Sequence, residues 1–396
     1  MNNIDGKKEL PGVKGPVCPY LKKCGGCISI GTPYEETLKK KRSEVEKLLK
    51  PYIRPEGIRG MDEPWHYRNK IHRACSYERN GKKEQHMSGI YAEGTHKIVP
   101  VKNCLIEDAA AEPVIRDIMK LARDFKIRNY DESTGNGLLR HILIRTGHVT
   151  GEMLVVLVLT NPVLPGKKHF IKALLDLHPE ITTVVLNINN RHTSMILGEK
   201  ETVAYGRGYI EDVLCGKRFR ISPKSFYQVN SIQTEYLYRK AIEYAELEGT
   251  ENVLDAYCGI GTISLAVSGL AAKVTGVESN RDAVRDAVVN AKLNGVENTH
   301  FICADAGDYM IRAASGGEKT DVLFMDPPRS GAEDAFLSAA AEAAPKKIVY
   351  ISCNPETLAR DLKKLIKRGY EVRRAEAVDM FPWTQHIETV CLLTHT

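Results

Sequence analysis

The fold is decided by the stretch Asn252-Val-Leu-Asp-Ala-Tyr-Cys-Gly-Ile-Gly-Thr-Ile-Ser-Leu-Ala266. An apolar run typical of a buried strand includes Asp255, a turn follows around Gly259 and Gly261, and a helical pattern then begins. Because the glycines carry no side chain, a cofactor can approach the backbone closely at the end of such a strand. The stretch therefore predicts an α/β domain with a ligand site at this turn, although a tight turn without a ligand gives the same pattern.

The sequence after Ser222 continues to alternate strands with helices, which is typical of a doubly wound, mostly parallel sheet. A helix is predicted first, over residues 233–248. Further strands are predicted over residues 274–278, 298–302, 321–325 and 348–352, and a last strand follows near Glu388. In such sheets ligands bind outside the carboxyl ends of the strands, so we expect the functional residues at that edge.

An acid at the end of the second strand suggests what the Gly-rich turn binds. The spacing of Glu278 after Gly261 suits a carboxylate that holds both hydroxyls of a ribose. The third glycine of a dinucleotide motif is absent, since Ser264 stands at its position, and no pyrophosphate site is evident. The pattern favours a nucleoside cofactor without phosphates, namely S-adenosylmethionine.

A cysteine lies at the end of the strand in Ile348-Val-Tyr-Ile-Ser-Cys-Asn-Pro-Glu-Thr-Leu-Ala-Arg360. Pro355 is well tolerated in the first turn of a helix, so Cys353 is predicted between the strand and the helix N-terminus. The positive end of the helix favours a thiolate, which makes Cys353 a candidate nucleophile. The alternative is a small buried side chain, the usual role of a free cysteine.

Two carboxylates accompany this cysteine. In Asp326-Pro-Pro-Arg329 a strand ends in an acid on a turn that the prolines make rigid. Glu388 follows the segment 379–387 at or near the start of the final strand, where an ordinary edge carboxylate is the alternative. A thiol and two carboxylates at one sheet edge are suited to nucleophilic and acid–base catalysis.

Cysteines also cluster near the N-terminus, in Cys18-Pro-Tyr-Leu-Lys-Lys-Cys24-Gly-Gly-Cys27. Cys104 is the best candidate for a fourth ligand of a shared metal centre. Four thiolates suit either Zn²⁺ or an iron–sulfur cluster, and the spacing alone leaves this choice open. The three-plus-one arrangement favours a [4Fe-4S] cluster, and unligated surface cysteines remain the alternative.

Basic residues in the first half suggest contact with nucleic acid. The segments 65–73 and 137–145 combine aromatic or apolar positions with cations, which suits RNA phosphates and unstacked bases. An edge strand with outward polar residues explains the first segment equally well, and the second predicts a strand with Arg140 and Arg145 on an exposed face. The candidates for RNA binding, with one from the second half, are Arg68, Lys70, Arg73, Arg140, Arg145 and Arg329.

Composition sets broader limits. The chain has 396 residues, a net charge of +6 and 43% hydrophobic residues, enough for two or three domains with ordinary cores. No apolar run has membrane-spanning length and no signal sequence is evident, so we expect a cytoplasmic protein that is a monomer. The predicted parts are a tail with the cysteine loop, a helical segment packed on the last domain, a central α+β domain and the catalytic domain, over residues 1–32, 33–62, 63–220 and 221–396.

In combination, these motifs resemble the RNA uracil-5 methyltransferase family. The matching segments are Ser222-Pro-Lys-Ser-Phe-Tyr-Gln-Val-Asn230, Asp255-Ala-Tyr-Cys-Gly-Ile-Gly261, Asp326-Pro-Pro-Arg329, Ser352-Cys-Asn-Pro355 and Asp379-Met-Phe-Pro382 through Glu388. The resemblance implies a Rossmann-like class I methyltransferase domain with a seven-stranded sheet, and an α+β domain that carries an iron–sulfur cluster. It implies methylation of carbon 5 of a uridine in RNA.

The resemblance also implies individual roles. Cys353 would be the nucleophile and Glu388 the general base. The S-adenosylmethionine site would be lined by Gln228, Tyr257, Glu278, Asp305 and Asp326, supported by Asp255, Gly259, Gly261 and Thr262. Thr262 stands where one type of relative has an Asn, which leaves that contact open.

Four cysteines match the cluster cysteines of the iron–sulfur-containing members of the family. They are Cys18, Cys24, Cys27 and Cys104. Those members mostly modify 23S ribosomal RNA, so that RNA is the expected substrate and transfer RNA is the alternative. Too few residues precede Cys18 for the small β-barrel RNA-binding domain that many relatives carry. A redox enzyme that uses the cluster for electron transfer is a further alternative, and so is a non-catalytic RNA-binding module.

Overall fold

The structure is a computed structural model that describes residues 16–80 and 83–396, and the chain divides into two units. The first unit contains the described residues up to Pro33 together with Pro64–Asp212 and Ile221–Lys224. The second contains Tyr34–Glu63, Val213–Arg220 and Ser225–Thr396. The tail expected before Pro16 lies outside the described residues.

The second unit is built on an eight-stranded sheet with the order β1-β16-β17-β15-β14-β11-β12-β13. Its strands are β1 (Ile58–Arg59), β11 (Asn252–Ala256), β12 (Lys273–Glu278), β13 (Thr299–Cys303), β14 (Val322–Met325), β15 (Lys347–Ser352), β16 (Tyr370–Val378) and β17 (Glu388–His395). The pairs are parallel except that β17 runs antiparallel to both β15 and β16. The prediction of seven strands was short by β1, a two-residue edge strand with no apolar run to reveal it.

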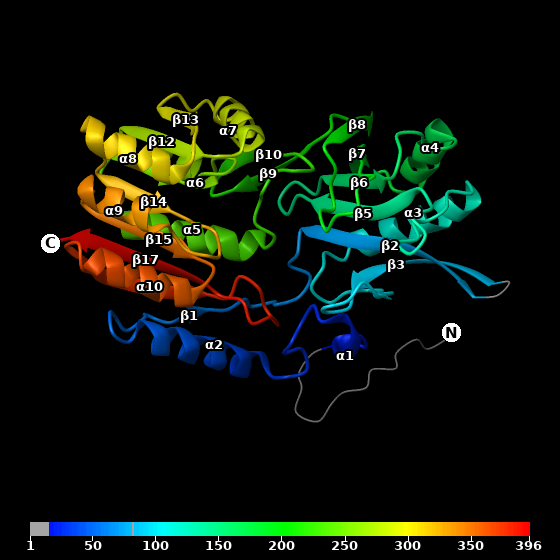
Figure 1. The fold of residues 1–396 in the computed structure, drawn as a ribbon, viewed down its shortest axis with the longest axis horizontal. Coiled ribbons are helices and arrows are strands. Elements are labelled where there is room, and N and C mark those ends of the chain that lie inside the picture. The colour runs from blue at the N-terminus through cyan, green and yellow to red at the C-terminus, as the bar shows by residue number, and fades with distance from the viewer. Residues whose placement is uncertain (1–15, 81–82) are drawn as a thin grey trace. The chain divides into compact units, whose positions relative to one another are not determined.

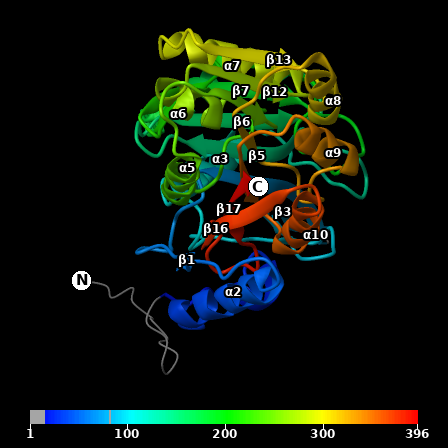
Figure 2. The same cartoon turned by 90° about the vertical axis from the view of Figure 1, so that its left-hand side faces the viewer.

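Helices cover both faces of this sheet. They are α2 (Tyr34–Leu49), α5 (Ser231–Ala245), α6 (Thr262–Val267), α7 (Arg281–Leu293), α8 (Ala306–Gly316), α9 (Asp334–Glu342) and α10 (Pro355–Ile366), with a 3₁₀ turn over Ser268–Leu270. Figure 2 shows α8, α9 and α10 on one side of the sheet and α5 and α6 on the other. Since both faces are covered, the central strand β14 is apolar along its whole length, Val322–Met325.

Capping residues set the helix starts at the carboxyl edge of this sheet. The side chain of Asn354 accepts a hydrogen bond from the N–H of Glu356 at the start of α10, and Pro355 occupies the first turn. Asp305 caps α8 in the same way. Gly261 has a φ of 83°, and an added Cβ there would come within 2.8 Å of the Phe301 ring. These caps and turns end the strands and start the helices at the same edge of the sheet.

The first unit contains a seven-stranded sheet with the order β4-β3-β2-β5-β6-β7-β8. Its strands are β2 (Lys70–Asn80), β3 (Lys83–Tyr91), β4 (Ile98–Val99), β5 (Leu139–Thr146), β6 (Met153–Leu159), β7 (Ile181–Ile188) and β8 (Lys200–Tyr205). The helices are α1 (Leu21–Cys24), α3 (Ala111–Asp124) and α4 (Lys167–Leu177), of which α3 and α4 lie beside the sheet (Figure 1). A separate pair joins β9 (Ile210–Leu214) to β10 (Lys217–Ile221).

Strand β5 corrects the prediction of an exposed basic face. All of its residues are buried, and the exposed fractions of Arg140 and Arg145 are 6% and 2%. Arg73 on β2 is 1% exposed. Alternation along the sequence revealed the strand, but the packing that covers its second face comes from residues distant in the chain.

No helix in the described part of the chain combines the length and the apolar character that crossing a bilayer requires.

Candidate active site

The strand register brings Cys353 and Glu388 together. Cys353 directly follows β15, and Glu388 is the first residue of β17. Because these strands are antiparallel, Ser352 pairs with Thr389, and the start of β17 lies at the carboxyl end of β15. Asp326 follows β14, the parallel neighbour of β15, so its carboxylate reaches the same edge. Residues that are 27 to 62 positions apart in the sequence thus form one group.

Two carboxylates in this group repel each other in a poorly solvated place. Glu388 is 3% exposed. Burial raises the pKa of Glu388 well above its ordinary value, and the charge of Asp326 raises it further. Burial likewise raises the pKa of Asp326, with a smaller contribution from the charge of Asp255. Burial and the charge of Asp326 on Glu388 both act against double ionisation, so the pair favours holding one proton near neutral pH.

The Cys353 thiol corrects the prediction of a stabilised thiolate. Burial raises the pKa of Cys353 to about 11, and the charges of Glu388 and Asp326 contribute to the same direction. The Cys353 backbone N–H and the guanidinium of Arg329 oppose this shift without cancelling it. Burial is the largest cause of the raised pKa of Cys353, and the two carboxylates add to it. Nucleophilic attack by this cysteine therefore requires a group that accepts its proton.

The turn that carries Arg329 is fixed to the start of α10. The side-chain N–H of Asn354 and the hydroxyl of Thr357 both donate to the carbonyl oxygen of Arg329, at 3.3 and 3.4 Å. Asp361 is fully buried and accepts from the N–H of Ala332 at 2.9 Å. The turn after β14 and the cysteine after β15 therefore move as one piece, with the Arg329 side chain exposed beside them.

A second group of predicted residues surrounds the Gly-rich turn after β11. Glu278 accepts hydrogen bonds from the backbone N–H of Gly259 at 3.1 Å and of Asn280 at 2.7 Å. Asp255 accepts from the N–H and the hydroxyl of Ser264 at 2.9 and 2.5 Å, while its other oxygen has no partner among the described residues. Burial raises the pKa of Asp255 to about 7. Asp255 thus holds the start of α6, and Glu278 holds the turn.

Tyr257 projects from this turn in a strained conformation. Its φ is 69°, which is unusual for a residue with a Cβ. Its ring lies 5.5 Å from that of Phe336, and burial together with the charge of Asp305 raises the pKa of its phenol. Gln228 is half-buried in the segment before α5, and the Thr262 hydroxyl lies 3.5 Å from that of Tyr238.

This donor set fits an adenosine-containing cofactor. An added Cβ at Gly259 would meet no atom within 4 Å, so the backbone there borders open space. Glu278 is half-buried at the strand end next to that space and suits ribose hydroxyls, and Asp255 has a buried oxygen without a partner. Tyr257 adds an aromatic face. The residues present can therefore hold a nucleoside without a phosphate-binding loop.

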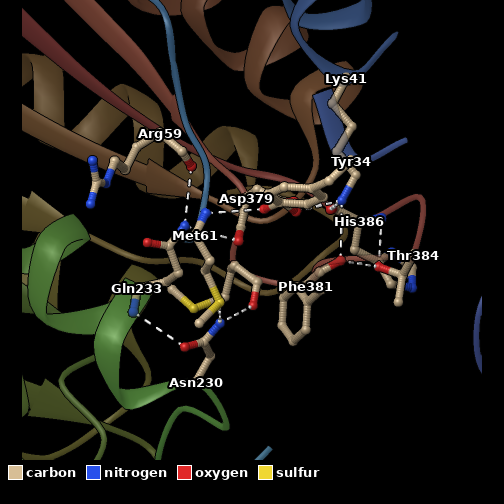
Figure 3. Close-up of polar contacts among 11 residues, drawn as sticks. Tyr34, Lys41, Arg59, Met61, Asn230, Gln233, Asp379, Phe381, Thr384 and His386 are labelled. Carbon is tan, nitrogen blue, oxygen red and sulfur yellow. Dashed lines mark hydrogen bonds and ion pairs between the residues drawn. The ribbon is translucent and has the colours of Figure 1, made fainter. Parts of the chain in front are cut away.

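A buried lysine that the sequence analysis missed controls the segment before Glu388 (Figure 3). Lys41 on α2 is 4% exposed and donates to the Asp379 carboxylate at 2.5 Å. It also donates to the carbonyl oxygens of Phe381 and His386 at 3.1 and 2.7 Å. The Tyr34 hydroxyl donates to the other Asp379 oxygen at 2.7 Å. One ammonium group thereby fixes both ends of the segment 379–386.

Helix α5 holds the same segment from its first turn. The side-chain N–H groups of Asn230 and Gln233 donate to the carbonyl oxygens of Met380 and Asp379, at 2.9 and 3.0 Å (Figure 3). The run 39–42 resembles a solvated charged face, which hid Lys41. A signal was available, since Thr37, Lys41, Val45 and Leu49 share the buried stripe of α2 at four-residue spacing.

The four N-terminal cysteines line one cavity of about 230 Å³ in the first unit. Burial and then the neighbouring thiols, Cys104 first, raise the pKa of Cys27 to about 12. Across residues 16–80 and 83–396, no group of three or more His, Cys, Asp or Glu side chains has the geometry to hold a metal ion. The cysteines predicted to share a centre are therefore neighbours, although they do not form a site for a single ion.

Two predicted RNA contacts, Arg68 and Lys70, line this same cavity. Burial lowers the pKa of Lys70 to about 8, and the charges of Arg145 and Arg68 contribute. Arg73 is used differently, because its guanidinium forms a two-pronged ion pair with Glu107. Arg73 is thus committed to a buried pair, which corrects its assignment to an exposed RNA surface.

Comparisons with known proteins identify the relatives of this chain. The sequence model of a family described as tRNA (Uracil-5-)-methyltransferase matches residues 33–396. An "Uncharacterized RNA methyltransferase" of Halalkalibacterium halodurans is 41% identical over 381 residues, which are 95% of this chain and 82% of the relative. One of Clostridium acetobutylicum with the same description is 43% identical over 385 residues, which are 96% of this chain and 83% of the relative.

One solved structure is similar over nearly the whole chain. It is the crystal structure of Pyrococcus abyssi tRNA (uracil-54, C5)-methyltransferase in complex with S-adenosyl-L-homocysteine. The TM-score is 0.79 at 28% sequence identity, and the match covers 95% of this chain and 86% of that chain.

The raised pKa of Cys353 predicts how fast its thiol is alkylated at each pH. The rate at which iodoacetamide alkylates Cys353 should rise about tenfold per pH unit from neutral pH without a plateau below about pH 10, because thiolate is the reactive form. Each single variant, Asp326→Asn or Glu388→Gln, leaves one carboxylate that ionises more readily. The double variant removes both carboxylates, and Cys353 in it should react several-fold faster at about pH 8. Peptide-resolved mass spectrometry measures the rates.

The exposed thiol of Cys303 serves as the internal control, and its alkylation should not differ among these variants. A plateau for Cys353 near neutral pH, or a double variant that reacts like the wild type, would contradict the electrostatic account.

The buried lysine predicts a large stability effect. Lys41→Met should lower the free energy of unfolding by about 3–5 kcal/mol, because the Asp379 carboxylate remains buried without its cation. Adding Asp379→Asn should recover part of the loss. The neighbouring Lys40 is exposed, so Lys40→Met should change stability by less than about 0.5 kcal/mol. Urea unfolding of the wild type and the three variants measures these free energies. Equal losses of unfolding free energy in Lys41→Met and Lys40→Met would show that the Lys41–Asp379 pair does not hold the segment 379–386.

Proposed function

The chain belongs to the tRNA (uracil-5-)-methyltransferase family of S-adenosylmethionine-dependent RNA methyltransferases, and we propose that it methylates carbon 5 of a uridine in RNA. The observation that carries this proposal is the placement of Cys353, Asp326 and Glu388 at one sheet edge by the register of β15 and β17. Carbon 5 of uracil is a poor nucleophile, and a thiol beside a carboxylate pair supplies what its activation needs.

The proposed reaction starts with the Cys353 sulfur. One carboxylate of the pair accepts the thiol proton, and the sulfur then forms a bond to carbon 6 of the uracil ring. The ring becomes an enolate, and carbon 5 gains the electron density to form a new carbon–carbon bond. S-adenosylmethionine supplies the electrophilic methyl group for that bond when it is present.

Glu388 completes the proposed cycle. The carboxylate pair first loses one of its two protons to water, so that the Glu388 carboxylate is free to remove the remaining proton from carbon 5. The electron pair then expels the Cys353 sulfur from carbon 6, and the sulfur regains a proton from the carboxylate pair. This releases 5-methyluridine and regenerates the thiol. The raised pKa values of Glu388 and Asp326 support the assignment, because a shared proton gives the site both a proton acceptor and a donor at neutral pH.

We propose the cofactor contacts from the polar and aromatic groups around the Gly-rich turn. Glu278 would accept from the ribose hydroxyls, and Tyr257 would offer its ring to the adenine. The remaining members of the proposed site are Gln228, Asp305, Asp326, Asp255, Gly259, Gly261 and Thr262. The solved relative from P. abyssi was crystallised with S-adenosyl-L-homocysteine, the product of this cofactor, which supports the choice.

The two catalytic residues give opposite outcomes when they are replaced. Cys353→Ala should abolish methyl transfer, since no bond to carbon 6 forms. Glu388→Gln should slow product release by about 10²–10⁴-fold and trap the covalent protein–RNA adduct as a slow band on a denaturing gel. Unmodified 23S ribosomal RNA and transfer RNA transcripts, tested side by side with labelled cofactor, provide the substrates.

Methyl transfer by Cys353→Ala at the wild-type rate would refute the nucleophile. A Glu388→Gln variant that turns over like the wild type and shows no adduct would assign the proton removal to another group, with Asp326 the first candidate. Thermal melting of each variant controls for folding.

We further propose 23S ribosomal RNA as the substrate and transfer RNA as the alternative. The cysteine pattern of the cluster-bearing relatives supports the first, and the P. abyssi enzyme, which is described as acting on tRNA uracil 54, supports the second. The transcript that is labelled in the experiment above decides between them. We expect the enzyme to act as a cytoplasmic monomer.

We propose that Cys18, Cys24, Cys27 and Cys104 hold a [4Fe-4S] cluster. A single Zn²⁺ needs four sulfurs at about 2.3 Å from one point, whereas a cluster needs a wider cage of thiolates. The four cysteines line one cavity, which supports a shared centre. Arg68 and Lys70 beside them would offset the charge of the thiolates.

Metal analysis of the purified protein tests this cluster. Anaerobically purified wild type should contain about four iron atoms per chain, and Cys24→Ser should lose most of this iron and melt at a lower temperature. Cys303→Ser, outside the cavity, should keep both the iron and the melting temperature. One zinc atom per chain and no iron would show that the site holds Zn²⁺ and not a [4Fe-4S] cluster. Unchanged iron content in Cys24→Ser would show that Cys24 is not a ligand.

A further inference from the structure

A second cavity in the first unit has no part in the proposed chemistry. Its volume is about 850 Å³, which is within the range that small ligands occupy. Its walls come from β2, β3, β4, β5 and the segment after α3. The lining combines rings, cations and acids, namely Tyr77, Tyr91, His96, Tyr130, Asp131, Glu132, Arg140 and His141, beside smaller side chains.

A buried arginine gives this cavity its chemistry. Arg140 is 6% exposed and forms no ion pair with any carboxylate among the described residues. Its Nη1 donates to the carbonyl oxygens of Asn189 and Arg191, both at 2.8 Å, while its Nε has no partner within the described chain. The Nδ1 of neighbouring His141 also lacks a partner there. Buried polar groups without partners are costly, so a ligand that supplies acceptors is expected at this wall.

Aromatic rings border the same space. The Arg140 guanidinium lies 4.6 Å from the ring centre of Tyr130, which keeps both groups in place by a cation–π contact. Tyr91 is half-buried and packs its ring edgewise on His96, with centres 6.1 Å apart. The charges of Glu132 and Arg140 both act on the Tyr91 phenol, so these groups face one space. Such an arrangement suits a flat ring that is flanked by side chains.

The carboxylates in the cavity wall favour a nucleobase over a phosphate group as the ligand. Asp131 and Glu132 line the cavity, and their negative charges would repel a phosphate group. A nucleobase instead offers amino or imino N–H groups to carboxylates and ring acceptors to Arg140 and His141. The donors, acceptors and rings of the wall therefore match the edge and the two faces of a base.

We propose that this cavity binds an unpaired nucleobase of the RNA substrate, distinct from the uridine that is methylated. The proposal rests on the proposed function, because it takes RNA as the ligand. RNA is read mainly through single-stranded bases that stack on aromatic side chains, and a second fixed base would help to select the target loop. The cavity assigns a positioning role to Tyr91, Tyr130 and Arg140 in place of the phosphate contact predicted for Arg140.

The test measures RNA binding separately from catalysis. Full-length Tyr91→Ala, Tyr91→Phe and wild-type protein are titrated with unmodified 23S ribosomal RNA and transfer RNA transcripts, and KM and kcat are measured on the methylated one. Tyr91→Ala should raise Kd and KM by about 5- to 150-fold with kcat unchanged, since stacking on one base is lost. Tyr91→Phe keeps the ring and should stay within about threefold.

A matched control and a second measurement protect the test against misfolding. Tyr205 is an exposed tyrosine on β8 of the same unit, and Tyr205→Ala should bind like the wild type. Wild-type protein is also cross-linked to transcripts that contain 4-thiouridine or 6-thioguanosine, and the cross-linked peptides are identified. Cross-links at residues 86–98 or 130–141 are expected.

The outcomes separate this proposal from the proposed function. Wild-type affinity in Tyr91→Ala, or cross-links confined to other segments, would overturn the nucleobase site even if uridine is methylated. Failure of the wild type to bind either transcript would overturn it as well. Cross-links in the cavity without methyl transfer would leave the base site standing and remove the proposed reaction.

Discussion

Burial of the Asp326 and Glu388 carboxylates, with the charge of Asp326 acting on Glu388, is the constraint on which the proposed chemistry depends. Both groups lie at the carboxyl edge of the sheet, where burial already disfavours a charge. The pair therefore keeps a proton, and the adjacent Cys353 keeps its own, with a pKa raised to about 11. The resting site is less charged than a count of its side chains suggests. In the proposed reaction a proton moves among these three neighbours, and no permanently ionised thiol is needed.

Holding these groups together costs stability, and the second unit offsets that cost with a rigid frame. The three residues come from three strands whose register is set by continuous apolar pairing. The segment before Glu388 has backbone carbonyl groups that are not bonded within a strand pair. Lys41 on α2 and Asn230 and Gln233 at the start of α5 donate hydrogen bonds to them. This network fixes the position of the segment that leads into Glu388.

The sequence predicted what depends on local pattern. The alternation of strands and helices indicated the α/β sheet, and the ends of its strands indicated Cys353, Asp326 and Glu278 at one edge. It could not predict β1, which has two residues and gains its place from pairing with β16. It also misjudged Lys41, Arg73, Arg140 and Arg145, whose charges are buried by partners or packing distant in the chain. The predicted direction of the Cys353 pKa shift was wrong for the same reason, because burial and the charges of Glu388 and Asp326 come from residues distant in the chain.

The most direct test of the central claim is release of tritium from RNA labelled with [5-³H]uridine. Substitution at carbon 5 must expel the hydrogen that carbon 5 carries, so the account predicts one tritium released to water for each methyl group transferred. Release should require both the cofactor and the Cys353 thiol. Methyl transfer to the RNA without tritium release would place the methyl group on another atom and contradict the mechanism at its first step.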